Sequence, residues 1–64
     1  MKNNIKIYRQ KLGISQGSLA ESLNVSRQTI NSIENGKFDP SLTLAIKLTK
    51  FFNEPVDALF EYKE

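Results

Sequence analysis

Polar side chains able to make hydrogen bonds are concentrated between Gln16 and Lys37, and their chemistry suits binding better than catalysis. Those facing one side of a predicted helix are Arg27, Gln28, Asn31 and Ser32. The chain contains no cysteine and no histidine, so it lacks a thiolate or imidazole to serve as nucleophile, general base or metal ligand. Phosphate-loop and dinucleotide-binding motifs are absent as well. We therefore expect no enzyme activity, no metal and no cofactor.

Two short helices joined by a tight turn would position these side chains. Ser15 and Ser26 each precede a predicted helix, where a serine hydroxyl accepts a hydrogen bond from the first turn. Asn24 stands at the turn, which requires a residue at positive φ, and Val25 would fill the gap between the helices. The second helix covers residues 27–34. The predicted apolar anchors are Leu19, Ala20, Leu23, Ile30 and Ile33.

Three further helices are predicted around this pair. One covers residues 4–11, and its apolar stripe extends to Leu12 before a stop at Gly13. Another begins near Asp39-Pro40, a cap followed by proline, and ends at Asn53. Its expected inward residues are Leu42, Ala45, Leu48, Thr49 and Phe52. The last opens at Pro55, with Val56, Leu59 and Phe60 on one face. The sequence thus predicts an all-α, compact five-helix domain.

The tail from Phe60 to Lys63 alternates apolar and charged residues, a pattern typical of a strand. Paired with residues 1–3 it would form a short two-stranded ribbon. A frayed end is the alternative that this pattern leaves open.

Length and charge set further bounds. Sixty-four residues are expected to make one domain, residues 1–64, with no membrane-spanning segment or signal peptide, and hence a cytoplasmic protein. Residues 1–37 carry six basic and two acidic side chains, a balance of +4, whereas residues 38–64 carry three and five, a balance of −2. The first part therefore suits a polyanion such as duplex DNA, although chance in so short a chain produces a similar imbalance.

Taken together, these motifs resemble the DNA-binding domain of the phage repressor/Cro family, also called the Xre family. The matching segments are RxxxGISQ from Arg9, LAExLNVSRQTINxIENGK from Leu19, and PSLxLA from Pro40. The chain departs from the family pattern at Gly17, Ser18, Asn24 and Thr49. The resemblance implies a helix-turn-helix over the second and third helices, with the latter entering the major groove.

The resemblance also implies roles for individual residues. Base edges would be met by Arg27, Gln28, Asn31 and Ser32, and phosphates by Gln16, Ser26, Thr29, Asn35 and Lys37. Arg9 and Glu34 would form a structural ion pair. Other interpretations stay open: Arg27 and Gln28 also fit a solvated helix face, and Gln16 and Asn35 also fit helix capping.

The leading hypothesis is a sequence-specific transcriptional regulator, a repressor, that binds a palindromic DNA operator as a homodimer. Its dimer interface would contain Val56, Leu59, Phe60 and Tyr62, with Phe51 or Phe52, unless these residues close the core of the monomer. The alternative is the antitoxin of a toxin–antitoxin pair with autorepressor activity, which the lack of an obvious toxin-wrapping segment disfavours. A protein-interaction module without DNA binding is a third possibility, which the basic, polar face disfavours.

Overall fold

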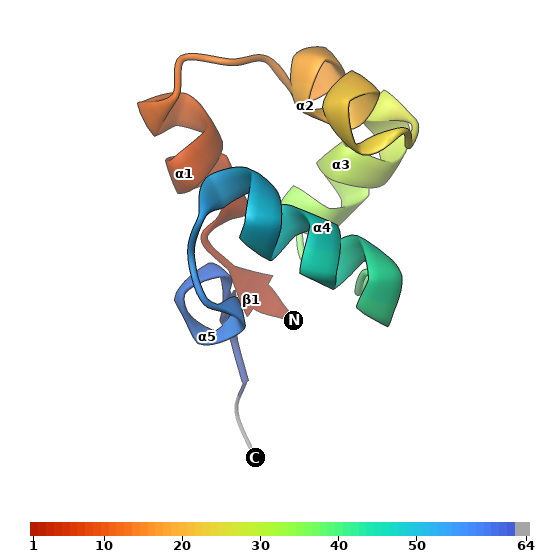
Figure 1. Ribbon diagram of the computed structural model, residues 1–64. Coiled ribbons are helices and arrows are strands. Elements are labelled where there is room, and N and C mark those ends of the chain that lie inside the picture. The colour runs from red at the N-terminus through yellow and green to blue at the C-terminus, as the bar shows by residue number, and fades with distance from the viewer. Residues whose placement is uncertain (63–64) are drawn as a thin grey trace.

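The computed structural model of the protein describes residues 1–62, and these form five helices and a two-stranded ribbon (Figure 1). In chain order the elements are β1 (Lys2–Asn3), α1 (Ile5–Lys11), α2 (Gln16–Leu23), α3 (Arg27–Glu34), α4 (Leu42–Phe52), α5 (Val56–Leu59) and β2 (Phe60–Glu61). The predicted fold class, including the ribbon, is confirmed. No helix in this described part of the chain is both long and apolar enough to cross a membrane.

The core receives apolar side chains from all five helices and from β2. Burial of these side chains is the main source of stability in a chain of this size. The buried residues are Ile5, Leu19, Ala20, Leu23, Ile30, Ile33, Leu44, Leu48, Leu59 and Phe60. Every apolar anchor predicted for α2 and α3 is among them.

Helix α4 differs from the sequence prediction in its start and in its inward face. It begins at Leu42, after Ser41 rather than at Asp39-Pro40, because the Ser41 hydroxyl accepts a hydrogen bond from the Leu44 N–H at 3.2 Å. Leu44 is buried, whereas Leu42 is 78% exposed. The helix carries two apolar stripes at helical spacing, and α4 turns the one through Leu44 and Leu48 toward the core.

The predicted stripe of α1 also ends differently. Leu12 follows the last residue of the helix and is exposed rather than buried. Gly13, at φ +68°, then reverses the chain so that Ile14 packs against the core instead. Gly13 therefore ends the helix as predicted, and Ile14 takes the place expected for Leu12.

Two residues predicted for a dimer interface belong to this chain's own core. Leu59 is fully buried and Phe60 nearly so. The reason is that α5 packs against α4 and β2 follows α5 without an intervening loop. The other two are largely exposed, Val56 at 54% and Tyr62 at 77%. The apolar surface expected from these four residues is therefore reduced to Val56 and Tyr62.

The ribbon joins the two ends of the described chain (Figure 1). Its strands are antiparallel, with Lys2 opposite Glu61 and Asn3 opposite Phe60. The Asn3 side-chain amide donates a hydrogen bond to the backbone carbonyl of Ile33, in the last turn of α3, at 2.7 Å. Strand β1 thus pairs with β2 and, through Asn3, also contacts the last turn of α3. Lys63, the last residue of the predicted strand, lies outside the described residues.

Candidate nucleic-acid interface

Local signals in the sequence determine the geometry of the α2–turn–α3 unit. Ser15 and Ser26 cap the two helices, each accepting from the backbone N–H three residues ahead, at 3.0 and 3.1 Å. Asn24 adopts φ 58° and ψ 45°, and the Val25 N–H closes the turn on the Ala20 carbonyl at 3.0 Å. Val25 packs against the core from the turn. Each serine therefore fixes the start of its own helix, and α2 and α3, joined by the tight turn, pack against each other (Figure 1).

The outer side of α3 carries the predicted base-edge residues and is flanked by two surface hollows. The first is lined by Gln16, Arg27, Gln28 and Asn31. The second is lined by Ser26, Gln28, Thr29, Ser32, Lys37 and Phe38. Gln28 takes part in both, so it lies on the ridge between them. Residues predicted for base contact and residues predicted for phosphate contact thus line two adjoining hollows that share Gln28. We call this surface the α3 face; its polar residues are Gln16, Ser26, Arg27, Gln28, Thr29, Asn31, Ser32 and Lys37.

The residues predicted for phosphate contact lie at the edges of the α3 face. Ser26 and Thr29 are also engaged in the cap, with their hydroxyl oxygens 2.8 Å apart. Asn35 caps the end of α3, and its side-chain nitrogen lies 3.5 Å from the side-chain oxygen Oδ1 of Asn31. Gly36, at φ +73°, turns the chain so that Lys37 borders the second hollow. Lys37 is the basic residue of this group, and it supplies the charge that a phosphate attracts.

Gln16 connects the α3 face to the interior. Its side-chain nitrogen donates to Glu34 Oε1 at 3.0 Å and to Asn31 Oδ1 at 3.2 Å. Gln16 is also the first residue of α2, where backbone N–H groups have no partner within the helix and favour an anion. Its backbone thus suits a phosphate, while its side chain is occupied by α3.

Arg9 and Glu34 form an ion pair beneath the α3 face. Arg9 Nε donates to Glu34 Oε2 at 2.7 Å, and a second guanidinium nitrogen donates to Oε1 at 3.2 Å. A third bond runs from Arg9 to the Ile14 carbonyl at 2.8 Å. The hydrogen bond and the charge of Glu34 raise the pKa of Arg9 above its usual value, although burial opposes the shift. The negative charge of Glu34 is therefore balanced by the Arg9 guanidinium, so an unpaired carboxylate does not face a polyanion.

Sequence reasoning overlooked two residues near this surface. Phe38 is about half exposed and lines the second hollow beside Lys37. Gly17 lies against Arg27, and a methyl group built there would be 4.0 Å from Arg27 Cδ, an ordinary contact. The sequence signal for Phe38 was an aromatic residue beside a lysine in a loop. For Gly17 no local pattern indicates proximity to Arg27.

Comparison with known proteins decides the family. Residues 5–59 match the family described as helix-turn-helix. The chain belongs to this family. An uncharacterized HTH-type transcriptional regulator of Methanocaldococcus jannaschii is 50% identical over 64 residues, covering all of this chain and 97% of the relative. YgzD, an uncharacterized HTH-type transcriptional regulator of Bacillus subtilis, is 42% identical over the same span, with 97% of its length covered. A further such regulator, from Archaeoglobus fulgidus, is 39% identical, with 91% covered.

Membership in the helix-turn-helix family agrees with the geometry of the unit. The matched range contains α2, the turn at Asn24, and α3, and it extends through α4 to the end of α5. It therefore covers both the pair of helices that carries the α3 face and the helices that support it.

Proposed function

We propose that this chain is a sequence-specific DNA-binding transcriptional regulator, a repressor, in which residues 1–64 act as one domain and α3 enters the major groove. The observation that carries the proposal is the α3 face. There, Arg27, Gln28, Asn31 and Ser32 offer hydrogen-bonding groups on the outer side of α3, whose inner side packs in the core through Ile30 and Ile33. Arginine and the amide side chains are the residues best matched to purine edges in the major groove.

The surroundings of α3 support docking on a polyanion. Lys37 and the backbone N–H groups at the start of α2 border the α3 face at two different edges. Glu34, an acid of α3 itself, is paired with Arg9, and its side chain is almost completely shielded from solvent. The surface offered to phosphates is therefore positive or neutral next to α3, as groove binding requires.

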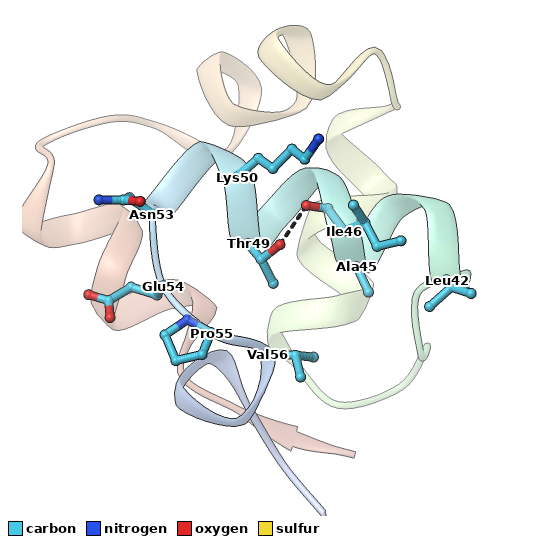
Figure 2. Close-up of a pocket in the computed structure, with 9 residues that line it drawn as sticks. All are labelled: Leu42, Ala45, Ile46, Thr49, Lys50, Asn53, Glu54, Pro55 and Val56. Atoms are coloured by element: carbon cyan, nitrogen blue, oxygen red, sulfur yellow. Dashed lines mark hydrogen bonds between the residues drawn. The ribbon is translucent and has the colours of Figure 1, made fainter.

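A homodimer on a palindromic operator is part of the proposal. An apolar groove of about 640 Å³ runs between α4 and α5, outside both hollows of the α3 face. Leu42 and Ile46 come from α4, and Val56 lies across from them at the start of α5 (Figure 2). All three are about half exposed or more, which is unusual for large apolar side chains clustered in so small a chain.

A second copy of the chain suits this groove as an occupant. Lys50 and Glu54 lie on the same groove, so a two-fold arrangement lets Lys50 of each copy approach Glu54 of the other. The described chain measures 32 × 21 × 19 Å. Two copies in contact therefore have the dimensions needed to reach half-sites about one helical turn, ~34 Å, apart.

The decisive experiment is selection of bound duplexes from a random pool, followed by titration of the selected site across a range of salt. We expect a two-fold symmetric site and a steep linear fall of log affinity with log salt. Lys37→Met should reduce that slope by about 1, with base preference unchanged. Lys47→Met, which removes a lysine of α4 outside both hollows, is the matched control and should keep the slope. Flat salt dependence without a preferred site would contradict the proposal.

A further inference from the structure

We propose that the buried Arg9–Glu34 pair fixes the hydrogen-bonding direction of Asn31, so that Asn31 presents only N–H donors to DNA. On this inference Asn31 selects base edges that accept hydrogen bonds, guanine best and cytosine least. Gln16 transmits the constraint from Glu34 to Asn31, and both Glu34 and Gln16 act as positioning residues. The inference rests on the proposed DNA binding and adds a determinant of sequence preference to it.

The first step is the direction of the Gln16 amide. An ionised carboxylate accepts hydrogen bonds and has none to donate. Glu34 Oε1 accepts from Arg9 at 3.2 Å and lies 3.0 Å from the Gln16 side-chain nitrogen. The side chain of Glu34 is only 2% exposed, so its carboxylate has little access to water. Gln16 must therefore direct its NH2 group, and not its carbonyl oxygen, toward Glu34.

The second step is the direction of the Asn31 amide. The Gln16 nitrogen has two hydrogens, and the second points to Asn31 Oδ1 at 3.2 Å. Asn35 donates to the same oxygen over a longer distance, 3.5 Å. If Asn31 were flipped, its own NH2 group would face the NH2 groups of Gln16 and Asn35. Such donor–donor contacts are unfavourable, so the network fixes Asn31 in one orientation.

The third step is what remains for a ligand. The Asn31 side-chain nitrogen makes no hydrogen bond with residues 1–62, and the residue is exposed on the first hollow beside Arg27. Its carbonyl oxygen is already used twice. Asn31 thus offers donors where an unconstrained asparagine would offer a donor and an acceptor together.

This difference determines which base fits. A free asparagine reads adenine by donating to N7 and accepting from the N6 amino group. With its oxygen occupied, Asn31 loses the second bond. Guanine presents two acceptors, N7 and O6, and cytosine presents only a donor. At the operator position that Asn31 reaches, we expect guanine to be preferred over cytosine by roughly fivefold or more.

The test compares the duplexes selected by the wild type with those selected by Asn31→Asp and Asn31→Ala. Aspartate has nearly the same shape but only accepts, so its preference at that position should reverse toward cytosine or adenine. Alanine should remove the preference there and nowhere else. Both variants change an exposed side chain and should fold. Added negative charge lowers affinity for every sequence, which leaves the ratio between bases interpretable.

The positioning role is tested with Glu34→Gln against Glu21→Gln. A glutamine at position 34 can donate, so Gln16 and Asn31 are released and guanine should lose its advantage over adenine. Glu21→Gln removes an equal charge from the exposed side of α2 and should behave as wild type. Selection is performed at a temperature where circular dichroism shows the variant folded. If Glu34→Gln does not fold, the two Asn31 variants decide the inference.

A measurement without DNA separates this inference from the proposed function. In the free protein, NMR should show slow exchange with water for the Gln16 side-chain amide protons and fast exchange for those of Asn31. Protection of Asn31 without protection of Gln16 would overturn the inference. A wild type that selects no site overturns the proposed function and the inference with it. A wild type that selects a site whose base preferences survive Asn31→Asp overturns the inference alone.

Discussion

Arg9 and Glu34 are joined by two hydrogen bonds, from Nε to Oε2 at 2.7 Å and from a terminal nitrogen to Oε1 at 3.2 Å. The pair links α1 to the last turn of α3, 25 residues further along the chain. The pKa of Arg9 is raised in the folded protein, mainly by its hydrogen bond to Glu34. The stability that this ion pair contributes is therefore fully present below the ordinary pKa of arginine. Arg9 therefore remains charged throughout the pH range in which DNA binding is measured.

Replacing Glu34 by glutamine should destabilise the fold strongly. The arginine would keep its charge in a site that is 11% exposed, without a carboxylate to neutralise it. Breaking a buried pair in this way costs about 3–5 kcal/mol. Thermal unfolding followed by circular dichroism measures the effect, and Glu21→Gln is the control for loss of one acid. An unchanged melting temperature together with full DNA affinity would show that the pair serves neither stability nor binding.

Replacing Arg27 by alanine should relax sequence preference at one operator position. Arg27 begins α3 and borders the first hollow, where a guanidinium can meet guanine O6 and N7 together. We expect a loss of about 1–3 kcal/mol on the preferred site and little change on sites that differ at that base. Fluorescence polarisation with a panel of single-base variants measures this. An equal loss on every duplex would make Arg27 a phosphate contact.

Asn24 should tolerate glycine and resist alanine. Its φ of 58° is one that glycine adopts freely and that alanine adopts at a cost of about 1–2 kcal/mol. Urea denaturation should therefore rank Asn24→Gly near the wild type and Asn24→Ala well below it. Equal stability of the two variants would mean that the turn rearranges and does not depend on the left-handed conformation.

Replacing Leu42 by aspartate should dissociate the proposed dimer without unfolding the chain. Leu42 is 78% exposed in the single chain, so the change adds a charge to the groove and removes little from the core. Sedimentation equilibrium should show a monomer, and affinity for a palindromic site should fall toward that of a half-site. Leu12→Asp, a similar change at an exposed leucine outside the groove, should remain dimeric. If Leu42→Asp remains dimeric as well, the two copies meet through another surface.

The sequence predicted α2 and α3 accurately because their limits depend on local chemistry. Ser15, Ser26 and Asn24 each act within a few residues of their own position, and the structure confirms both caps and the turn. The sequence did not distinguish a terminal ribbon from a frayed end, and in the structure the ribbon forms between Lys2–Asn3 and Phe60–Glu61.

Helix α4 could not be predicted equally well, because both of its stripes are apolar. One runs through Leu42 and Ile46 and the other through Leu44 and Leu48, so periodicity alone does not say which faces the core. The choice depends on where α2 and α5 lie, which is a property of the whole fold.

The hydrogen-bonded link from Glu34 through Gln16 to Asn31 could not be predicted from the sequence either, since it joins side chains 15 and 18 residues apart.

The hydrogen bond from Asn3 to the Ile33 carbonyl has a consequence for how the molecule opens. Carbonyl groups in the last turn of a helix have no partner within it, and the Ile33 carbonyl accepts two hydrogen bonds from outside the helix, from the Gly36 N–H at 2.9 Å and from the Asn3 side chain of β1 at 2.7 Å. Displacement of β1 from α3 would therefore leave the Ile33 carbonyl with the Gly36 N–H as its remaining partner among these two. The terminal ribbon and α3 are thus linked through Asn3, so fraying at the chain ends would remove one contact that supports the helix proposed to read DNA.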